Sequence, residues 1–281
     1  MMDISEALRA RIESSVADAL VEDIGGGDVS AALISPAAEA RGVVVARQDG
    51  VFCGQPWVEE VARQMGGAFE ADWHVRDGAD LNAGQALFEL HGQARAVLTA
   101  ERTVLNFVQL LSGTATRTRH FVRLLEGTGC QLLDTRKTLP GLRLAQKYAV
   151  RCGGGTNHRL GLYDAYLIKE NHIAAAGSIG AAVTEARKRQ SGLPVEVEVE
   201  SLTELGEALA AAADTIMLDN FSIAETKQAV ALTGGGARLE ASGGIDESQI
   251  RAIAETGVDC ISVGALTKDV APLDLSMRFS L

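Results

Sequence analysis

The stretch "PVEVEVESLTELGEALAAAADTIMLDN", residues 194–220, indicates the fold class of this 281-residue chain. Residues 195–200 alternate valine with glutamate, which is the period-two pattern of a β-strand. "LTELGEALAAA" then has a helical composition, and "TIMLDN" is a second short apolar run that ends in polar residues. A strand, a helix and another strand in immediate succession predict parallel strands joined by a right-handed crossover.

The same rhythm continues through the chain from about Gly113 onward. Further strand-like runs are "CQLLDT", "AYLIKE", "RLEAS" and "CISVGA", and further helical stretches are "AAVTEARKRQ", "SIAETKQAVAL" and "DESQIRAIAET". About six such units predict a compact α/β barrel, with an open parallel sheet as the alternative.

The residues before Gly113 follow a different pattern. Residues 5–22 are predicted to be a helix, because apolar residues recur at helical spacing at Ile4, Leu8, Ile12 and Val16. Residues 71–98 alternate around D-G and N-A-G turns, as in a meander of strands. A helix is expected from about 99 to 111, with Arg102, Asn106 and Gln109 on its polar face. This portion is therefore expected to be α+β.

Composition limits the possible partners. The chain has 26 Lys+Arg against 37 Asp+Glu, a formal net charge of −11, which disfavours nucleic acid as a partner. Its four cysteines form no C-x-x-C pair, so we expect free thiols and neither a zinc site nor a disulfide framework. No apolar leader and no run of about 20 apolar residues is present, so we expect a cytoplasmic protein without a membrane anchor.

Polar residues follow the predicted strands at their carboxyl ends. Arg136 and Lys137 follow "LLDT", Lys169, Asn171 and His172 follow "AYLI", Asp219 and Asn220 close "IMLDN", Ser242 closes "LEAS", and Gly264 follows "ISV". In a barrel these ends line one mouth, where active sites form. The sequence therefore predicts one site built from several strands.

The glutamates of "PVEVEVES" need partners if this strand belongs to a barrel. Helices cover the outside of a barrel, so Val195, Val197 and Val199 should face outward and the glutamates inward. Buried carboxylates require cations or a metal. Arg136, Lys137, Arg159 and Lys169 are candidate cations, and Glu198 with Asp219 is a candidate Mg²⁺ site.

A local concentration of cations in an acidic chain predicts a small anionic ligand. "RCGGGTNHRLGLYDAYLIKENHI", residues 151–173, carries two arginines, a lysine and two histidines around a glycine triplet. Arginines favour carboxylates, whereas Mg²⁺ with backbone N–H groups of "EASGGI" and "SVGALT" favours a phosphorylated compound. A polycarboxylate would therefore suit the arginines, and a phosphorylated co-substrate would suit Mg²⁺ and the backbone N–H groups.

Long motifs of this chain closely resemble those of the quinolinate phosphoribosyltransferase (decarboxylating) family. They are "EDIGGGDVS", "ERTVLNFVQLLSGTAT", "DTRKTLPGLRLAQKYAVRCGGGTNHRLGLYDAYLIKENHI", "VEVEVES", "IMLDNF", "EASGGI" and "SVGALT". The resemblance implies an N-terminal α+β sandwich domain over 1–113, an incomplete TIM-like α/β barrel over 114–269, and a tail over 270–281 that packs back on the first domain. It also implies a homodimer, or a higher oligomer, in which Arg102 enters the partner's site.

The resemblance further implies a reaction and its residues. Quinolinate and phosphoribosyl pyrophosphate would give nicotinate mononucleotide, pyrophosphate and CO₂, a step of NAD biosynthesis. Arg136, His158, Arg159 and Lys169 match positions that hold quinolinate. The positions for phosphoribosyl pyrophosphate and Mg²⁺ match Thr135, Lys137, Glu198, Asp219, Ser242, Gly243, Gly244, Val263, Gly264 and Ala265. Lys137, Lys169, Glu198 and Asp219 would be catalytic, and Glu198 and Asp219 would hold the metal.

Two departures and three alternatives accompany this resemblance. Leu139 stands where a smaller polar residue is expected, and "LAQKYAV" replaces a more usual Leu-Glu; both bear on affinity. A molybdenum-transport-associated relative would lack the Lys-x-Asn-His run at 169–172. A Schiff-base lyase would use Lys169 as its nucleophile. A lipoyl- or biotinyl-type carrier is suggested by the hairpin pattern of "VRDGADLNAGQALFEL", but that segment contains no lysine to modify.

Overall fold

The computed structural model describes residues 3–190 and 192–281 and contains two compact units. The first unit comprises residues 1–119, 138–154 and 266–281, and the second comprises residues 120–137 and 155–265. Across the described residues, no helix combines the length and the apolar character needed to cross a membrane.

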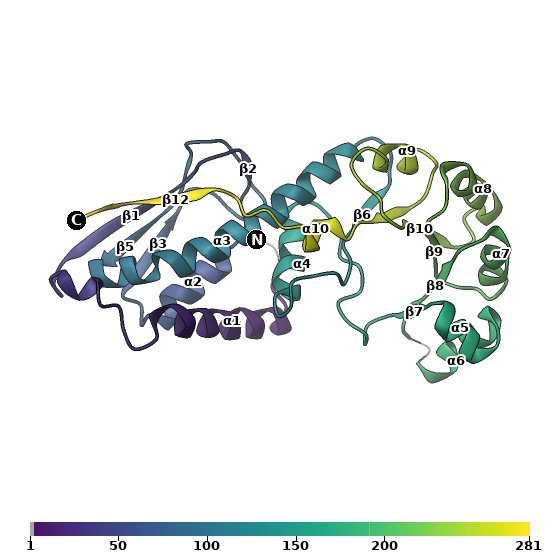
Figure 1. Ribbon diagram of the computed structural model, residues 1–281, viewed down its shortest axis with the longest axis horizontal. Helices are drawn as coiled ribbons and strands as arrows, with labels where there is room; N and C mark the ends of the chain where they lie inside the picture. Colours follow the sequence, from purple (N-terminus) through teal and green to yellow (C-terminus); the bar gives the residue numbers. More distant parts are fainter. Residues whose placement is uncertain (1–2, 191) are drawn as a thin grey trace. The chain divides into compact units, whose positions relative to one another are not determined.

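The first unit is built around a four-stranded antiparallel sheet with helices along it (Figure 1). The strand order is β12-β1-β5-β3, and a short two-stranded sheet joins β2 and β4. The elements of this unit are α1 (Glu6–Ile24), η1 (Ala31–Leu33), β1 (Glu39–Ala46), β2 (Gly50–Val51), α2 (Gln55–Gln64), β3 (Phe69–Trp73), β4 (Asp80–Leu81), β5 (Ala86–Gln93), α3 (Ala94–Leu124, continuing past the unit), α4 (Arg143–Cys152) and β12 (Leu275–Ser280).

Helix α1 forms where helical periodicity predicted it. Ser5 caps its first turn by accepting a hydrogen bond from the Leu8 N–H, and Gly25 ends it in a positive-φ conformation. Its buried stripe, formed by Leu8, Ile12, Val16 and Leu20, belongs to the core of the first unit. The C-terminal tail contributes β12, which pairs with β1 in antiparallel register.

Helix α3 is longer at both ends than the sequence indicated. The expected end near residue 111 was wrong, because Gly113 lies inside the helix and is not a break. A Cβ at residue 113 would overlap the Ala271 carbonyl of the tail, so this glycine permits a close approach of two segments. The division between the two units lies further along α3, between residues 119 and 120. Residues 138–154 belong to the first unit.

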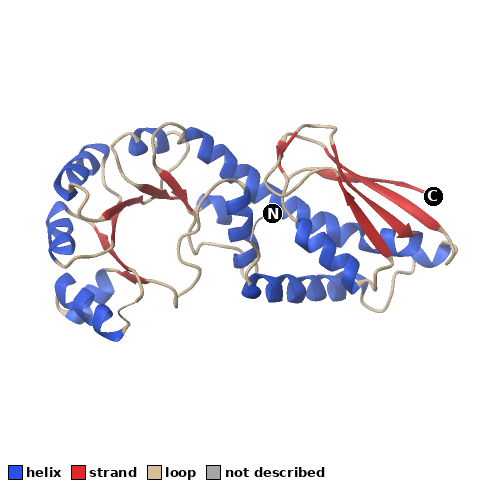
Figure 2. Ribbon diagram, turned by 180° about the vertical axis from the view of Figure 1, so that it is seen from behind, coloured by secondary structure: helices blue, strands red, loops and turns tan. Residues whose placement is uncertain are grey.

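The second unit is a six-stranded parallel sheet whose strands form an inner layer under helices (Figure 2). The strand order is β6-β11-β10-β9-β8-β7, so consecutive strands pair from β7 to β11 and β11 then pairs with β6. The bounds are β6 (Gln131–Leu133), β7 (Tyr166–Ile168), α5 (Glu170–Ala176), α6 (Ile179–Arg189), β8 (Val195–Val199), α7 (Leu202–Ala210), β9 (Thr215–Asp219), α8 (Ile223–Thr233), β10 (Arg238–Ser242), α9 (Ile250–Ala254), β11 (Cys260–Ser262) and α10 (Ala265–Lys268, where the units meet in sequence).

This strand order is that of an incomplete barrel. Strands β6 and β7 would have to pair to close it, and they do not do so in the described part of the chain. Most of the residues between them, 138–154, belong to the first unit. The open side of β6 instead carries a single bridge from Leu133 to Thr156. The barrel that strand-helix alternation predicted is confirmed in this open form.

The alternating strand β8 has the predicted orientation. Val195, Val197 and Val199 are fully buried, as expected for side chains under the helical layer. Glu196 and Glu198 occupy the other face, and each pairs with a cationic group of the same unit. The inner face of β8 therefore contributes carboxylates to the barrel interior.

Candidate active site

Parallel pairing brings the polar residues of the strand ends to one edge of the second unit's sheet. Asp219 at the end of β9 lies in register with Ser242 at the end of β10. The segments that follow β6, β7 and β11 leave the sheet at the same edge, since all six strands run in one direction. They carry Thr135, Arg136, Lys137, Lys169, Val263, Gly264 and Ala265.

Lys169 and Glu198 form an ion pair between neighbouring strands. Ile168 is in register with Val197, so the next residue on each strand, Lys169 and Glu198, meet at the sheet edge. The backbone N–H of Lys169 donates to Nδ1 of His172, which fixes the start of α5. His172 therefore orients the backbone of Lys169, and the Asn171 side chain donates to the neighbouring Glu170.

Arg136 and Arg159 bring two positive charges together. Burial lowers the pKa of Arg159, and the charge of Arg136 lowers it further. One Arg159 nitrogen, Nη1, donates to the Ala165 carbonyl at 3.3 Å, which holds the loop before β7. Two guanidinium groups that repel one another make a site in which an anion with more than one carboxylate is favoured.

His158 points into the barrel interior. Its Nε2 lies 3.0 Å from Glu196 Oε2 and 3.4 Å from Glu240 Oε2. Burial lowers the pKa of His158, whereas the hydrogen bonds to these two glutamates act in the opposite direction and raise it. The Arg159 N–H opposes a second proton on the ring, because it donates to Nδ1 at 2.7 Å. Nε2 is therefore the nitrogen that carries a proton toward the carboxylates.

Glu196 and Glu240 are almost completely buried, at 6% and 1% exposure. Burial raises the pKa of Glu196, and its hydrogen bond to His158 opposes that rise. The charge of Glu240 raises the pKa of Glu196 further. The sequence interpretation named Arg136, Lys137, Arg159 and Lys169 as cations that could offset the inward glutamates. The ion pair of Glu196 is with His158, and its charge also raises the pKa of Arg159. Glu240 was not identified at all from the sequence.

Asp134 anchors the backbone that leads to His158. This aspartate is fully buried directly after β6, and its two oxygens accept from the Asn157 side chain at 2.7 Å and the His158 N–H at 2.8 Å. The Thr156 N–H donates to the Leu132 carbonyl at 2.9 Å. The end of the glycine-rich stretch is thereby fixed along the open edge of β6.

A glycine turn lies next to the Asp219 carboxylate. Asn220 has a φ of 58°, donates its backbone N–H to the Ser242 carbonyl, and donates its side-chain amide to Asp219 Oδ2 at 2.8 Å. A Cβ at Gly243 would overlap the Asn220 side chain, whereas nothing lies within 4 Å of such an atom at Gly244. The backbone beside Gly244 is thus open to an anionic group.

Gly264 makes room for Lys137. A Cβ at residue 264 would lie 3.0 Å from Lys137 Cδ and 3.6 Å from Thr135 Oγ1. Thr135 accepts the Lys137 N–H at 3.0 Å, so the turn after β6 holds the lysine stem across the glycine. The Lys137 side chain depends for its position on the absence of a side chain at residue 264.

Glu198 and Asp219 are suitable donors for a hard cation. Glu198 is in register with Met217, so Asp219, two residues further along β9, faces the same side of the sheet. Both offer carboxylate oxygens, which Mg²⁺ prefers, and both are partly exposed at the strand ends. The donor set therefore fits Mg²⁺.

A second cluster of metal-ligating groups lies in the first unit and has a structural explanation. Cys53, Asp77 and Cys152 have ligand atoms within 4.8 Å of one another. Asp77 accepts from the backbone N–H groups of Gly54 and Gln55 at the start of α2, and from the Tyr148 hydroxyl at 2.6 Å. Both of its oxygens are used, and burial raises the pKa of the Cys53 thiol, which disfavours the thiolate.

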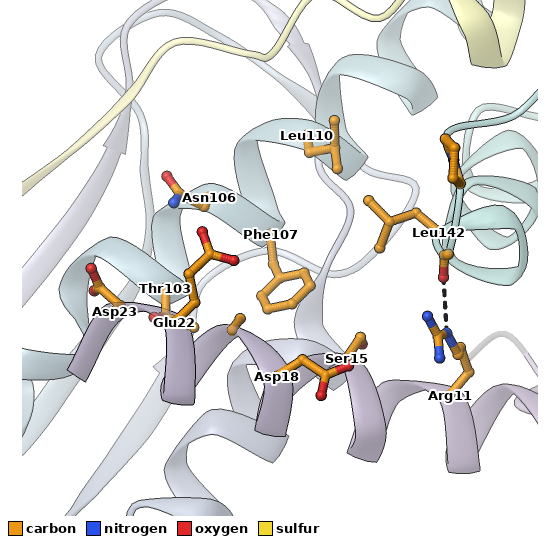
Figure 3. A pocket seen from close by; sticks show the side chains of 13 residues that line it. Arg11, Ser15, Asp18, Glu22, Asp23, Thr103, Asn106, Phe107, Leu110 and Leu142 are labelled. Carbon is orange, nitrogen blue, oxygen red and sulfur yellow. Dashed lines mark hydrogen bonds between the residues drawn. The ribbon is translucent and has the colours of Figure 1, made fainter. Parts of the chain in front are cut away.

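The polar face predicted on the long helix is partly confirmed. Arg102 and Asn106 are exposed on α3. Asn106 lines a cavity of about 330 Å³ within the first unit, together with the acidic residues Asp18, Glu22 and Asp23 (Figure 3). At the same cavity, Arg11 donates a hydrogen bond to the Gly141 carbonyl at 2.8 Å. The Gln109 side chain instead fixes the tail, since its Nε2 donates to the Leu275 carbonyl at 3.2 Å.

The unusual "LAQKYAV" segment has a structural role. Gln146 is buried in α4, where its side chain accepts the Leu139 N–H at 2.8 Å and donates to the Thr267 carbonyl at 2.8 Å.

The Schiff-base alternative is disfavoured by the Lys169–Glu198 pair, because an ammonium held by a carboxylate is a poor nucleophile.

Two family models together match most of the chain. The description "Quinolinate phosphoribosyl transferase, N-terminal domain" matches residues 28–112, and "Quinolinate phosphoribosyl transferase, C-terminal domain" matches residues 114–278.

Individual relatives agree with these models. A Bacillus subtilis protein named probable nicotinate-nucleotide pyrophosphorylase [carboxylating] is 44% identical, covering 93% of this chain and 91% of its own. A Mycobacterium leprae nicotinate-nucleotide pyrophosphorylase [carboxylating] is also 44% identical, covering 92% of this chain and 94% of its own. The solved structure of the Francisella tularensis nicotinate-nucleotide pyrophosphorylase is 48% identical, with a TM-score of 0.96 and complete coverage of both chains.

Proposed function

This chain belongs to the quinolinate phosphoribosyltransferase family, and we propose that it transfers the phosphoribosyl group of phosphoribosyl pyrophosphate to quinolinate with loss of CO₂. The products would be nicotinate mononucleotide, pyrophosphate and CO₂, which places the enzyme in NAD biosynthesis. One observation carries the proposal: the same sheet edge holds a cationic group around Arg136 and Arg159 and a carboxylate group around Glu198 and Asp219.

The cationic group suits a pyridine dicarboxylate. Quinolinate carries two adjacent carboxylates, and its binding would relieve the repulsion that lowers the pKa of Arg159 next to Arg136. Guanidinium groups can grip each carboxylate with two hydrogen bonds, which also fixes the plane of the ring. Lys169, held by Glu198, would add a third positive charge, and His158 would form the edge of this pocket.

The carboxylate group suits the second substrate. Lys137 and Thr135, with the turns at Ser242–Gly244 and Val263–Ala265, would contact the phosphates of phosphoribosyl pyrophosphate. Glu198 and Asp219 would hold Mg²⁺. When bound, that ion would offset the charge of the pyrophosphate leaving group.

The bond changes require little acid–base chemistry from the protein. The quinolinate nitrogen forms a bond to ribose C1 as the C1–O bond to pyrophosphate breaks, and an aromatic nitrogen needs no deprotonation. The 2-carboxylate then leaves as CO₂, and the electron pair left on the ring carbon takes up a proton. The carboxylates of Glu198 and Asp219 would stabilise positive charge that develops at C1, and the arginines would hold the nitrogen in line with it.

The assembly and location belong to the same proposal. We expect a cytoplasmic homodimer, or a higher oligomer, with Arg102 of each subunit entering the site of its partner; its exposure on α3 is compatible with such a role. Nucleic acid is not an expected partner of a chain with a net charge of −11.

The direct experiment supplies the purified protein with quinolinate, phosphoribosyl pyrophosphate and Mg²⁺ and measures nicotinate mononucleotide and pyrophosphate. Both products should accumulate in equal amounts. Replacing quinolinate with nicotinate is the matched control, since nicotinate lacks the carboxylate that is lost. Product formation from nicotinate but not from quinolinate would contradict the proposal.

A further inference from the structure

The interior cluster of His158, Glu196 and Glu240 has no part in the bond changes described above. Glu196 lies on β8 and Glu240 on β10, on either side of β9, and the His158 ring bridges them from the loop that follows residue 155. All three side chains are largely buried, with side-chain exposures of 8% for Glu196, 1% for Glu240 and 11% for His158.

Such an arrangement is costly and so requires a reason. The Oε1 atoms of both glutamates are buried and have no hydrogen-bond partner among the described residues. Two neighbouring buried carboxylates are unfavourable unless a shared donor compensates for them. His158 Nε2 is the donor that both share, so the two glutamates restrain the imidazole from two strands.

A divalent cation in place of the Nε2 proton fits the geometry less well. A histidine that binds metal through Nε2 carries its proton on Nδ1 and donates it to an acceptor. Nδ1 of His158 instead faces a donor, the Arg159 N–H at 2.7 Å. The cluster is therefore better explained as a hydrogen-bonded support for the histidine.

The support continues into the cationic group. The His158 backbone N–H is held by Asp134 at 2.8 Å, and its ring accepts the N–H of the next residue, Arg159. Fixing the ring thus fixes the backbone at Arg159 from two directions. Arg159 in turn lies close enough to Arg136 for their charges to interact.

We propose that Glu240, together with Glu196, is a positioning residue for the dicarboxylate pocket, which acts by holding the His158 ring and through it the Arg159 backbone. This inference rests on the proposed function of that pocket. It predicts that Glu240 affects the affinity for quinolinate without contacting it. Phosphoribosyl pyrophosphate binding, which is proposed to use Lys137, the Ser242–Gly244 turn and Asp219 but not His158, should not depend on Glu240.

The test compares Glu240→Gln with Glu247→Gln. Glu247 is a matched control because it also pairs with a histidine of the second unit, His120, at 2.9 Å on the surface. We expect Glu240→Gln to raise the KM for quinolinate by about tenfold or more, with kcat and the KM for phosphoribosyl pyrophosphate within about twofold of the wild type. Glu247→Gln should change none of the three. An equal loss in both KM values, or a loss in kcat alone, would overturn the proposal.

Two further measurements separate positioning from a general effect on folding. In a His158→Asn background, Glu240→Gln should add less than about a twofold change in the KM for quinolinate, because the route through the ring is already broken. If Glu240→Gln does not fold, Glu240→Asp serves instead, since it keeps the charge but withdraws it from Nε2. Full additivity with His158→Asn would contradict an action through His158.

A spectroscopic measurement does not depend on activity. The ¹⁵N imidazole signals of His158, assigned by their loss in His158→Asn, should shift in Glu240→Gln and stay in place in Glu247→Gln. If the wild type does not turn over quinolinate, the proposed function is wrong. The signals would still test whether Glu240 holds the His158 ring in place. Unchanged His158 signals in Glu240→Gln would overturn the positioning role even in an active enzyme.

Discussion

Lys169, on the turn after β7, pairs with Glu198 on β8, so a cation expected to hold quinolinate is bound to a carboxylate expected to hold magnesium. The pairing follows from strand register, since Ile168 and Val197 are aligned immediately before them. The two substrate groups of the site are therefore joined by one ion pair. Removing either residue would leave the charge of the other without its partner at the strand ends.

Replacing Lys169 tests this connection. Lys169→Ala should lower kcat/KM for quinolinate roughly 10²-fold or more, because it removes one pocket cation and leaves Glu198 unpaired. Steady-state kinetics with each substrate varied in turn provides the measurement. Lys227→Ala, on the outer helix α8, is the control and should behave as the wild type. A Lys169→Ala enzyme with unchanged kinetics would show that the pair has no part in the reaction.

Gly264 tests the second substrate's side of the site. Gly264→Ala places a Cβ 3.0 Å from Lys137 Cδ, so the lysine must move and the KM for phosphoribosyl pyrophosphate should rise several-fold more than that for quinolinate. Gly206→Ala is the control, because it lies in helix α7 with nothing within 4 Å of the added Cβ. We expect that control to stabilise the protein by about 0.5–1 kcal/mol with unchanged kinetics. Equal KM changes for both substrates in Gly264→Ala would argue against a specific effect on Lys137.

The proposed sharing of sites between subunits has a direct test. Arg102→Ala and Lys169→Ala should each be inactive alone, but subunits exchanged between them should regain up to about a quarter of the wild-type activity. Half of the dimers would then be mixed, and each mixed dimer would hold one intact site. Activity is measured after co-refolding or co-expression of the two variants. A mixture that remains inactive although mixed dimers have formed would exclude a role for Arg102 in the partner's site.

Asp214 should contribute to stability at the acid end of the pH range. Its hydrogen bond from Arg187, at 2.8 Å, lowers its pKa, and Asp214 also accepts the Val195 N–H at the start of β8. Because the folded-state pKa lies below the unfolded value of about 4, this contribution is complete above that pH and declines as the pH falls through the folded pKa. The Tm difference between wild type and Asp214→Asn should therefore shrink between about pH 5 and pH 2. A Tm difference that stays constant over this range would contradict the assignment.

Local patterns in the sequence were sufficient to predict the second unit's strands. Val195, Val197 and Val199 alternate with glutamates, and the short apolar runs are followed by polar residues, so the strands and their polar carboxyl ends follow from local order. The extent of α3 did not follow, because a glycine that serves close packing cannot be distinguished in sequence from one that ends a helix. Gly113 is such a case.

Contacts between distant segments explain what the sequence did not reveal in the site. Glu240 is a single glutamate in "RLEAS" and shows no alternation, and its partner His158 comes from a loop before β7. In the same way, Cys53 and Cys152 lie far apart in the chain but meet beside Asp77. Only the folded arrangement brings these residues together. The position of Glu240 two residues before Ser242, on the same face of the strand, is the one sequence signal that could have indicated an inward glutamate.

The fate of the quinolinate carboxylates tests the central claim most directly. Quinolinate labelled with ¹³C in the 2-carboxylate should release labelled CO₂ in step with pyrophosphate when phosphoribosyl pyrophosphate and Mg²⁺ are present. Quinolinate labelled in the 3-carboxylate should instead retain its label in nicotinate mononucleotide. Release of labelled CO₂ without pyrophosphate, or retention of the 2-carboxylate label in a nucleotide product, would contradict decarboxylating phosphoribosyl transfer.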